Sequence, residues 1–166
     1  MGGLIISATG HRLGPKLGGY DKSVFKDLVL LARHSLLISK PKKVISGMAI
    51  GWDQAVSFAA YDLSIPYIAA VPFQGQEAKW PEESQKLYRD LLSLAEHVEV
   101  VSPFYSSRNM QVRNEWMVDR ADEMLALWDG TFGGTHNCII YAEKKGVPIR
   151  NVWSAWDRLT LARLLG

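Results

Sequence analysis

Residues 43–53 read KVISGMAIGWD. Within these eleven residues the sequence changes from a strand pattern to a turn pattern, and then to the start of a helix. The apolar run at 43–46, which contains the β-branched residues Val44 and Ile45, is typical of a buried strand. The segment from Ser46 to Asp53 contains Gly47 and Gly51 and is typical of a turn, because glycine adopts backbone conformations that other residues avoid. We expect a helix to start at this turn, so the stretch predicts one βα unit of a parallel sheet.

The same pattern recurs along the chain, since short apolar runs alternate with longer segments of helical periodicity. Strands are predicted at residues 4–8, 43–46, 67–71, 98–101, 124–128 and 148–152. Helices are predicted after an N-cap at Asp21, from Pro81, over 109–120, from an N-cap at Thr135 to Gly146, and over 155–165. The fold class is therefore α/β, a Rossmann-like doubly wound, mostly parallel sheet of about six strands with helices on both faces.

Composition narrows the class of protein further. The 166 residues are 48% apolar and 22% charged, which indicates one globular domain spanning 1–166. The net charge is +2 without a basic block, so a nucleic-acid partner is not expected. The chain has one cysteine, Cys138, so we expect no intramolecular disulfide. It has no metal-binding motif, so we expect neither a metal nor a cofactor. The apolar run at 4–6 is too short for a membrane span or signal peptide, so we expect a cytoplasmic protein.

Ligands of doubly wound sheets bind beyond the carboxyl ends of the strands. The segments that follow the predicted strands include TGHR at 9–12, SGMAIGWD at 46–53 and DGTFGGT at 129–135. Glycines let backbone N–H groups approach an anion and a helix that starts there adds its dipole, so the last two segments predict phosphate cradles. The predicted ligand-binding residues are Gly10, His11, Arg12, Ser46, Gly47, Met48, Gly51, Asp53, Arg113, Asn114, Asp129, Gly130, Gly133, Gly134 and Thr135.

Other interpretations of these residues remain open. Glycines occur in most βα turns, and His11 with Arg12 could form a solvated loop. Arg113 suits a phosphate or carboxylate through bidentate hydrogen bonds, or it lies on an exposed helix face. Trp52 and Trp80 follow strands and could stack on a base, or they pack in the core.

Taken together, four segments resemble the YpsA-like branch of the SLOG superfamily, and the resemblance covers nearly the whole chain. They are Thr-Gly-His-Arg at 9–12, Ser-Gly-Met-Ala-x-Gly-x-Asp at 46–53, Arg-Asn-x-x-Met-Val-Asp at 113–119 and Asp-Gly-x-x-Gly-Gly-Thr at 129–135. The resemblance implies a Rossmann-like domain that binds a nucleotide or nucleotide-derived ligand at the strand ends. It also implies a homodimer or larger homo-oligomer, for which Trp116, Trp153 and Trp156 are candidate contact residues.

The superfamily also includes DNA-processing proteins and the lonely-guy phosphoribohydrolases, which release a base from a nucleoside monophosphate. The catalytic glutamate of those hydrolases should follow Gly134-Thr135, where this chain has His136, Asn137 and Cys138. N-glycosidic cleavage usually needs a carboxylate, and Asp53, Asp129 or Glu115 could replace the glutamate, with Asp53 and Asp129 as the catalytic candidates. Asp53 could instead be a helix N-terminal carboxylate, and Asp129 an Asx-turn residue.

Three functions therefore compete. The sequence favours binding or sensing of a phosphate-bearing, nucleotide-like ligand. A nucleoside-monophosphate phosphoribohydrolase is the alternative. A DNA-processing or DNA-binding protein is the second alternative, and it ranks last because the sequence lacks the basic patch that DNA binding requires.

Overall fold

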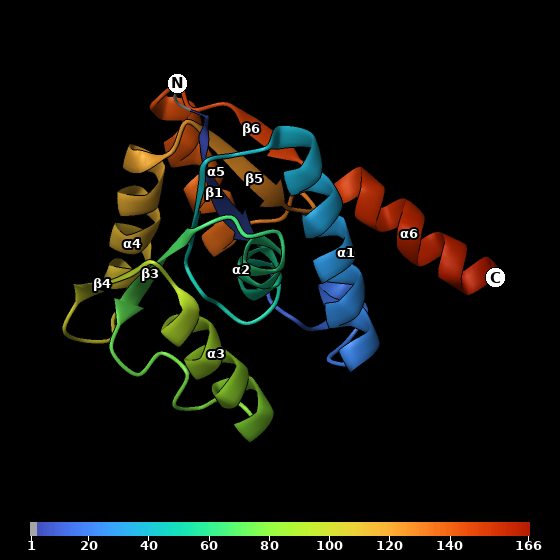
Figure 1. Cartoon of the computed structure of the whole chain (residues 1–166), viewed down its shortest axis with the longest axis horizontal. Helices are drawn as coiled ribbons and strands as arrows, with labels where there is room; N and C mark the ends of the chain where they lie inside the picture. The colour runs from blue at the N-terminus through green and yellow to red at the C-terminus, as the bar shows by residue number, and fades with distance from the viewer. Residues whose placement is uncertain (1–2) are drawn as a thin grey trace.

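The computed structural model describes residues 3–166, and its centre is a parallel sheet with the strand order β4-β3-β2-β1-β5-β6 (Figure 1). Every strand pair is parallel, which confirms the predicted Rossmann-like fold. The strands are β1 (Ile5–Gly10), β2 (Lys43–Ser46), β3 (Tyr67–Phe73), β4 (His97–Ser102), β5 (Glu123–Leu127) and β6 (Ile149–Asn151).

A helix follows each strand, as the alternating pattern predicts. The helices are α1 (Lys22–Ser39), α2 (Trp52–Asp62), α3 (Glu82–Leu94), α4 (Ser107–Arg120), α5 (Gly134–Lys144) and α6 (Trp153–Leu165), and a 3-10 turn, η1 (Pro15–Leu17), precedes α1. Helices α1, α2, α3 and α6 share one core on one face of the sheet, while α4 and α5 cover the other.

Both faces of the central strands are apolar because helices cover both of them. On β1, Ile6 and Ala8 pack in the larger core with α1 and α2, whereas Ile5 points to the opposite face. Trp52 and Trp156 are the largest side chains buried in the larger core. Under α4, the smaller core contains Ile45, Ala70 and Met117.

Several boundaries differ from the sequence-based predictions. Strand β1 continues to Gly10 because that residue pairs with Leu127 of β5. Helix α5 begins at Gly134 with Gly133 as its N-cap, so the prediction that Thr135 caps it is wrong. Helix α4 begins earlier than predicted, because the side chain of Ser106 accepts a hydrogen bond from the N–H of Asn109 and caps the helix.

The tryptophan predictions also change. Trp52 is wholly buried, and its Nε1 donates to the carbonyl of Leu125 at 3.2 Å, so it cannot stack on a base. Trp156 is 2% exposed and is therefore unavailable as a contact between copies of the chain. Trp153 meets the ring of His11 edge-on at 5.8 Å and so supports the strand ends from the α6 side.

The sheet places the turns after β1 and β5 at the point where the strand order reverses, because β1 pairs with β2 on one side and β5 on the other. The turn after β1 is also joined to the turn after β2. Arg12 forms an isolated antiparallel bridge with Gly51, and the N–H of Trp52 donates to the carbonyl of His11 at 3.2 Å. These contacts fix the direction in which His11 and Arg12 leave the sheet.

This junction predicts a strict requirement for glycine at position 51. Gly51 has φ of 114°, and a Cβ there would lie 2.6 Å from the backbone N of Leu13. We expect Gly51→Ala to lower the free energy of unfolding by about 3 kcal/mol, because backbone strain and a clash with main chain act together. Urea denaturation of the variant and the parent measures the difference.

Gly18→Ala is the matched control for this measurement. Gly18 has φ of 92°, but a Cβ there meets nothing within 4 Å. The Gly18→Ala variant should therefore lose only about 1 kcal/mol of unfolding free energy, which is the cost of a left-handed backbone conformation. Equal losses at both positions would contradict the role given to the junction.

Candidate functional site

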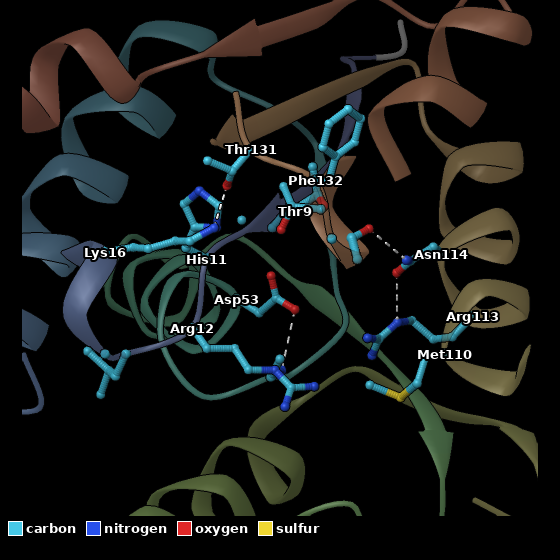
Figure 2. Close-up of a pocket in the computed structure, with 18 of the residues that line it drawn as sticks. Thr9, His11, Arg12, Lys16, Asp53, Met110, Arg113, Asn114, Thr131 and Phe132 are labelled. Carbon is cyan, nitrogen blue, oxygen red and sulfur yellow. Dashed lines mark hydrogen bonds between the residues drawn. The ribbon is translucent and has the colours of Figure 1, made fainter. Parts of the chain in front are cut away.

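A pocket of about 450 Å³ lies at the carboxyl ends of the strands, where the strand order reverses (Figure 2). The turn after β1, the start of α2, the middle of α4 and the segment that leads into α5 enclose it. Nine predicted ligand residues line it: Gly10, His11, Arg12, Asp53, Arg113, Asn114, Gly133, Gly134 and Thr135. The pocket thus brings together segments that are far apart in the sequence.

The N-terminus of α5 presents unsatisfied backbone donors to this pocket. The N–H of Asn137 donates to the carbonyl of the N-cap residue, Gly133, at 3.0 Å. Gly133 has no side chain that could cap the N–H groups before Asn137. Among residues 3–166, no group accepts from the N–H of Gly134, Thr135 or His136. A helix start of this kind combines free donors with the positive end of the helix dipole, so it suits an anion.

Asp53 lies in the first turn of α2 and is 6% exposed. Its Oδ2 accepts from the N–H of Ala49 at 3.3 Å, while its Oδ1 has no hydrogen-bond partner among the described residues. Figure 2 shows its carboxyl group in the middle of the labelled side chains, between Arg12 and Thr9. Burial raises the pKa of Asp53 to about 6, although the charge of Arg113 and the bond from Ala49 oppose this shift. Asp53 is therefore a buried acid that changes its protonation near neutral pH.

Arg113 of α4 is 5% exposed and is held by main-chain carbonyls. Its Nη1 donates to the carbonyl of Gly47 at 2.6 Å and to that of Ala70 at 3.2 Å, and its Nε donates to Asn114 Oδ1 at 3.2 Å. Burial lowers the pKa of Arg113, and the charge of Asp53 opposes this shift. A guanidinium stays protonated in proteins, so Arg113 supplies fixed positive charge to the pocket.

The turn after β2 supports the pocket from beneath. Ser46, Gly47 and Met48 are buried and do not line the cavity. Ser46 Oγ donates to the carbonyl of Asp53 at 2.9 Å and accepts from the N–H of Met48 at 3.1 Å, so these groups bond within the turn. A Cβ on Gly47 would lie 2.6 Å from Arg113 Nη1, which explains the glycine. Of the predicted cradle at 46–51, Ala49 alone lines the pocket.

Asp129 has a different environment from Asp53. Its Oδ1 lies 2.8 Å from His11 Nε2 and accepts from the N–H of Thr131 at 3.1 Å and from the Thr131 hydroxyl at 2.6 Å. Burial raises the pKa of Asp129, but the Thr131 hydrogen bonds and His11 outweigh it and lower the pKa to about 2. Asp129 is therefore ionised, and its backbone N–H also donates to His11 Nε2, at 3.0 Å. It orients His11 beside the pocket instead of lining it.

The pocket also contains residues that sequence reasoning missed. Lys16 in η1 donates to the Thr131 hydroxyl, so it joins the turn after β1 to the turn after β5. Tyr20 and Phe132 line the pocket and are 73% and 87% exposed. Phe132 lies inside the glycine-rich segment 129–135, and this position in the sequence could have identified it as a site residue. Lys16 carried no signal, because η1 was not predicted.

Two other kinds of site are absent from residues 3–166. No helix there combines the length and the apolar character needed to cross a membrane. The same residues contain no group of three or more His, Cys, Asp or Glu side chains that could hold a metal ion.

Comparison with known proteins supplies the family. The model of the YpsA family, described as the YspA SLOG family, matches residues 25–151. The uncharacterized SPbeta prophage-derived protein YoqJ of Bacillus subtilis (strain 168) is 31% identical over 137 residues, which cover 72% of this chain and 80% of YoqJ. A UPF0398 protein of Bacillus cereus (strain G9842) is 24% identical over 166 residues, with 90% and 88% of the two chains covered.

Similar solved structures share the fold at low sequence identity. DNA processing protein A of Streptococcus pneumoniae superposes with a TM-score of 0.62 at 16% identity over 88% of this chain, which spans 49% of that protein. The same protein of Helicobacter pylori gives 0.61 at 17% identity, with 89% and 64% of the two chains covered. The structure of TM1055 gives 0.59 at 16% identity, with 88% and 72% covered.

The raised pKa of Asp53 predicts a distinctive pH dependence of stability. Its pKa is about 6 in the folded chain against the ordinary value of 3.8, so the folded chain binds more protons between about pH 4 and pH 6. Its contribution to the free energy of unfolding therefore falls as pH rises through this window, on the order of 3 kcal/mol in all. We expect Asp53→Asn to match the parent near pH 4 and to exceed its stability at pH 7, as measured by urea denaturation.

Asp129→Asn is the control of opposite sign. The pKa of Asp129 is lowered to about 2, so its stabilising contribution is present above the unfolded value and is lost in acid. Asp129→Asn should therefore be less stable than the parent at pH 7. The environment described for Asp53 would be contradicted if the difference in free energy of unfolding between the parent and Asp53→Asn were the same at pH 4 and pH 7.

Proposed function

The chain belongs to the YspA SLOG family, and from this premise we propose that it is a single SLOG-type domain that binds or senses a nucleotide or nucleotide-derived ligand. The observation that carries the proposal is the free N-terminus of α5, which opens into a pocket at the reversal point of the sheet. Pockets at this position of α/β sheets are the usual ligand sites of the architecture.

The ligand's phosphate would accept from the N–H groups of Gly134, Thr135 and His136. A Cβ at Gly134 meets nothing within 4 Å, so open space lies beside these donors. Arg12 and Lys16 line the same pocket and add positive charge. Backbone donors at a helix start and nearby cations are the two elements from which phosphate sites are built.

Asp53 supports a ligand that carries more than a phosphate. Its Oδ1 is buried without a partner in the described chain, and a buried polar atom of this kind is costly until a partner satisfies it. A sugar hydroxyl can donate to the carboxylate or accept from the carboxylic acid. The combination of an anion site and a hydroxyl partner favours a phosphorylated sugar, which every nucleotide contains.

The proposal predicts that Gly134→Val removes binding without unfolding the protein. Gly134 has no left-handed backbone conformation and no close neighbour, so the side chain fits the fold but fills the phosphate space. We expect the Kd for AMP, measured by calorimetry, to rise at least tenfold while the Tm changes by no more than about 2 °C.

Ile140→Val is the matched control, because Ile140 lies on the same helix but is 49% exposed and does not line the pocket. Its Kd should equal that of the parent. Unchanged affinity in Gly134→Val for each of AMP, UMP and ADP, with binding retained by the parent, would place the phosphate elsewhere.

Hydrolysis of a nucleoside monophosphate is the second candidate, and the raised pKa of Asp53 is the observation that favours it. An acid that titrates near neutral pH suits proton transfer. The position of the lonely-guy glutamate is taken by Cys138, which is buried, and burial raises the pKa of its thiol to about 11. Any turnover would therefore depend on Asp53, since Asp129 is already bonded to His11 and Thr131.

We expect the protein to bind AMP and release adenine poorly or not at all, because a missing catalytic carboxylate commonly slows a reaction a hundredfold or more. Chromatography of free base and ribose 5-phosphate measures the turnover of the parent, Asp53→Asn and Asp129→Asn. Efficient turnover that Asp53→Asn abolishes and Asp129→Asn retains would replace the binding function with hydrolysis.

The expectation against nucleic acid is not supported. The Helicobacter pylori neighbour is described by its single-stranded DNA binding mode, and it shares this fold. A backbone phosphate of DNA has the same chemistry as the phosphate proposed here, although at 17% identity the likeness concerns the fold alone. The homo-oligomer and the cytoplasmic location stay predictions.

A further inference from the structure

Phe132 is a highly exposed side chain at the mouth of the pocket. It lines the cavity, is 87% exposed and immediately precedes Gly133, the N-cap of α5. Figure 2 shows it at the side of the pocket opposite Arg12, with its ring turned outward. A single exposed phenylalanine is ordinary on a protein surface, so its meaning depends on what surrounds it.

The segment that carries Phe132 is held by hydrogen bonds among the residues that precede it. The N–H and hydroxyl of Thr131 donate to Asp129, and Trp128 Nε1 donates to the carbonyl of Thr131 at 2.8 Å. The contacts that order this segment thus come from its polar groups, and they leave the phenyl ring largely unpacked. An exposed ring on a braced segment is available to a ligand with little reorganisation.

Phe132 belongs to a row of rings that we call the aromatic rim, which consists of Phe132, His136 and Trp128. The ring centroids of Phe132 and His136 are 4.8 Å apart at 79°, and those of His136 and Trp128 are 5.7 Å apart at 38°. His136 meets Phe132 edge-on and therefore leaves most of the phenyl surface open. Of these three rings, that of Phe132 lines the pocket.

His136 links the aromatic rim to the phosphate site. Its side chain contacts Phe132, while its backbone N–H is one of the free donors at the start of α5. An anion held by these donors therefore lies beside the rim, and a flat ring attached to that anion through a short linker reaches Phe132. A nucleoside phosphate has this construction, because its base and phosphate are joined through one sugar.

We propose that Phe132 stacks on the base of the bound ligand, so that the pocket takes nucleoside phosphates in preference to sugar phosphates that have no base. This inference rests on the proposed function and adds to it the residue that recognises the base. Stacking of a base on an aromatic side chain tolerates any base, since each has a π-face. The rim therefore sets a preference for a base without selecting which one.

The test compares AMP with ribose 5-phosphate, which differ by the base, in the parent, Phe132→Ala and Phe132→Tyr. We expect the parent to bind AMP about tenfold more tightly or better than ribose 5-phosphate. Phe132→Ala should bind both with nearly equal affinity, through loss of AMP affinity alone, while Phe132→Tyr keeps the preference. Calorimetry gives the four affinities for parent and alanine variant, and the Tm of each protein verifies its fold.

Phe104→Ala is the matched control, because Phe104 is 73% exposed and does not line the pocket. It should bind both compounds like the parent. Equal affinities of the parent for the two compounds, or a preference for AMP that survives in Phe132→Ala, would overturn the stacking role while leaving the phosphate site intact. Failure of the parent to bind either compound would overturn the proposed function, and the stacking role with it.

Discussion

The guanidinium of Arg113 joins helix α4 to the turn after β2 and to strand β3. Helix α4 carries it on one face of the sheet, and its Nη1 reaches the carbonyl of Gly47 after β2 and that of Ala70 in β3. A buried cation must be paired or hydrogen-bonded, because the transfer of an unsatisfied charge from water is prohibitively costly. The conformation of the turn after β2 is therefore tied to α4, and Asp53 sits where its charge compensates that of Arg113.

This constraint divides the two glycine-rich turns between different tasks. The polar groups of the turn after β2 form hydrogen bonds with Arg113, Ser46 and Asp53. This turn therefore forms the floor of the pocket. At the start of α5, by contrast, the N–H groups of Gly134, Thr135 and His136 have no acceptor among residues 3–166. Sequence composition treats the two turns alike, since both are glycine-rich segments between a strand and a helix. Their difference is created by one residue of α4 that folding brings to Gly47.

Much of the fold follows from the sequence because strand and helix periodicity are local properties. Strand β2 has the predicted bounds, 43–46, and the remaining strands differ by one or two residues at their ends. The errors have non-local causes. Gly10 extends β1 because β5 is beside it, and Trp52 is buried because a glycine at position 10 leaves room for its ring, which a Cβ would approach to 2.5 Å. The position of Phe132 at the pocket mouth depends likewise on contacts between distant turns.

The two candidate acids show the same limit at the level of chemistry. Asp53 and Asp129 both follow strands in glycine-rich segments, and nothing local distinguishes them. In the fold, burial raises the pKa of Asp53 to about 6, whereas hydrogen bonds from Thr131 and the proximity of His11 bring the pKa of Asp129 to about 2. One acid keeps its charge and orients a histidine at the pocket wall, while the other titrates inside the pocket. Because the charged form of Asp53 repels an anion, the proposed ligand, which brings a hydroxyl as well as a phosphate, would suit this pocket better than a phosphate alone.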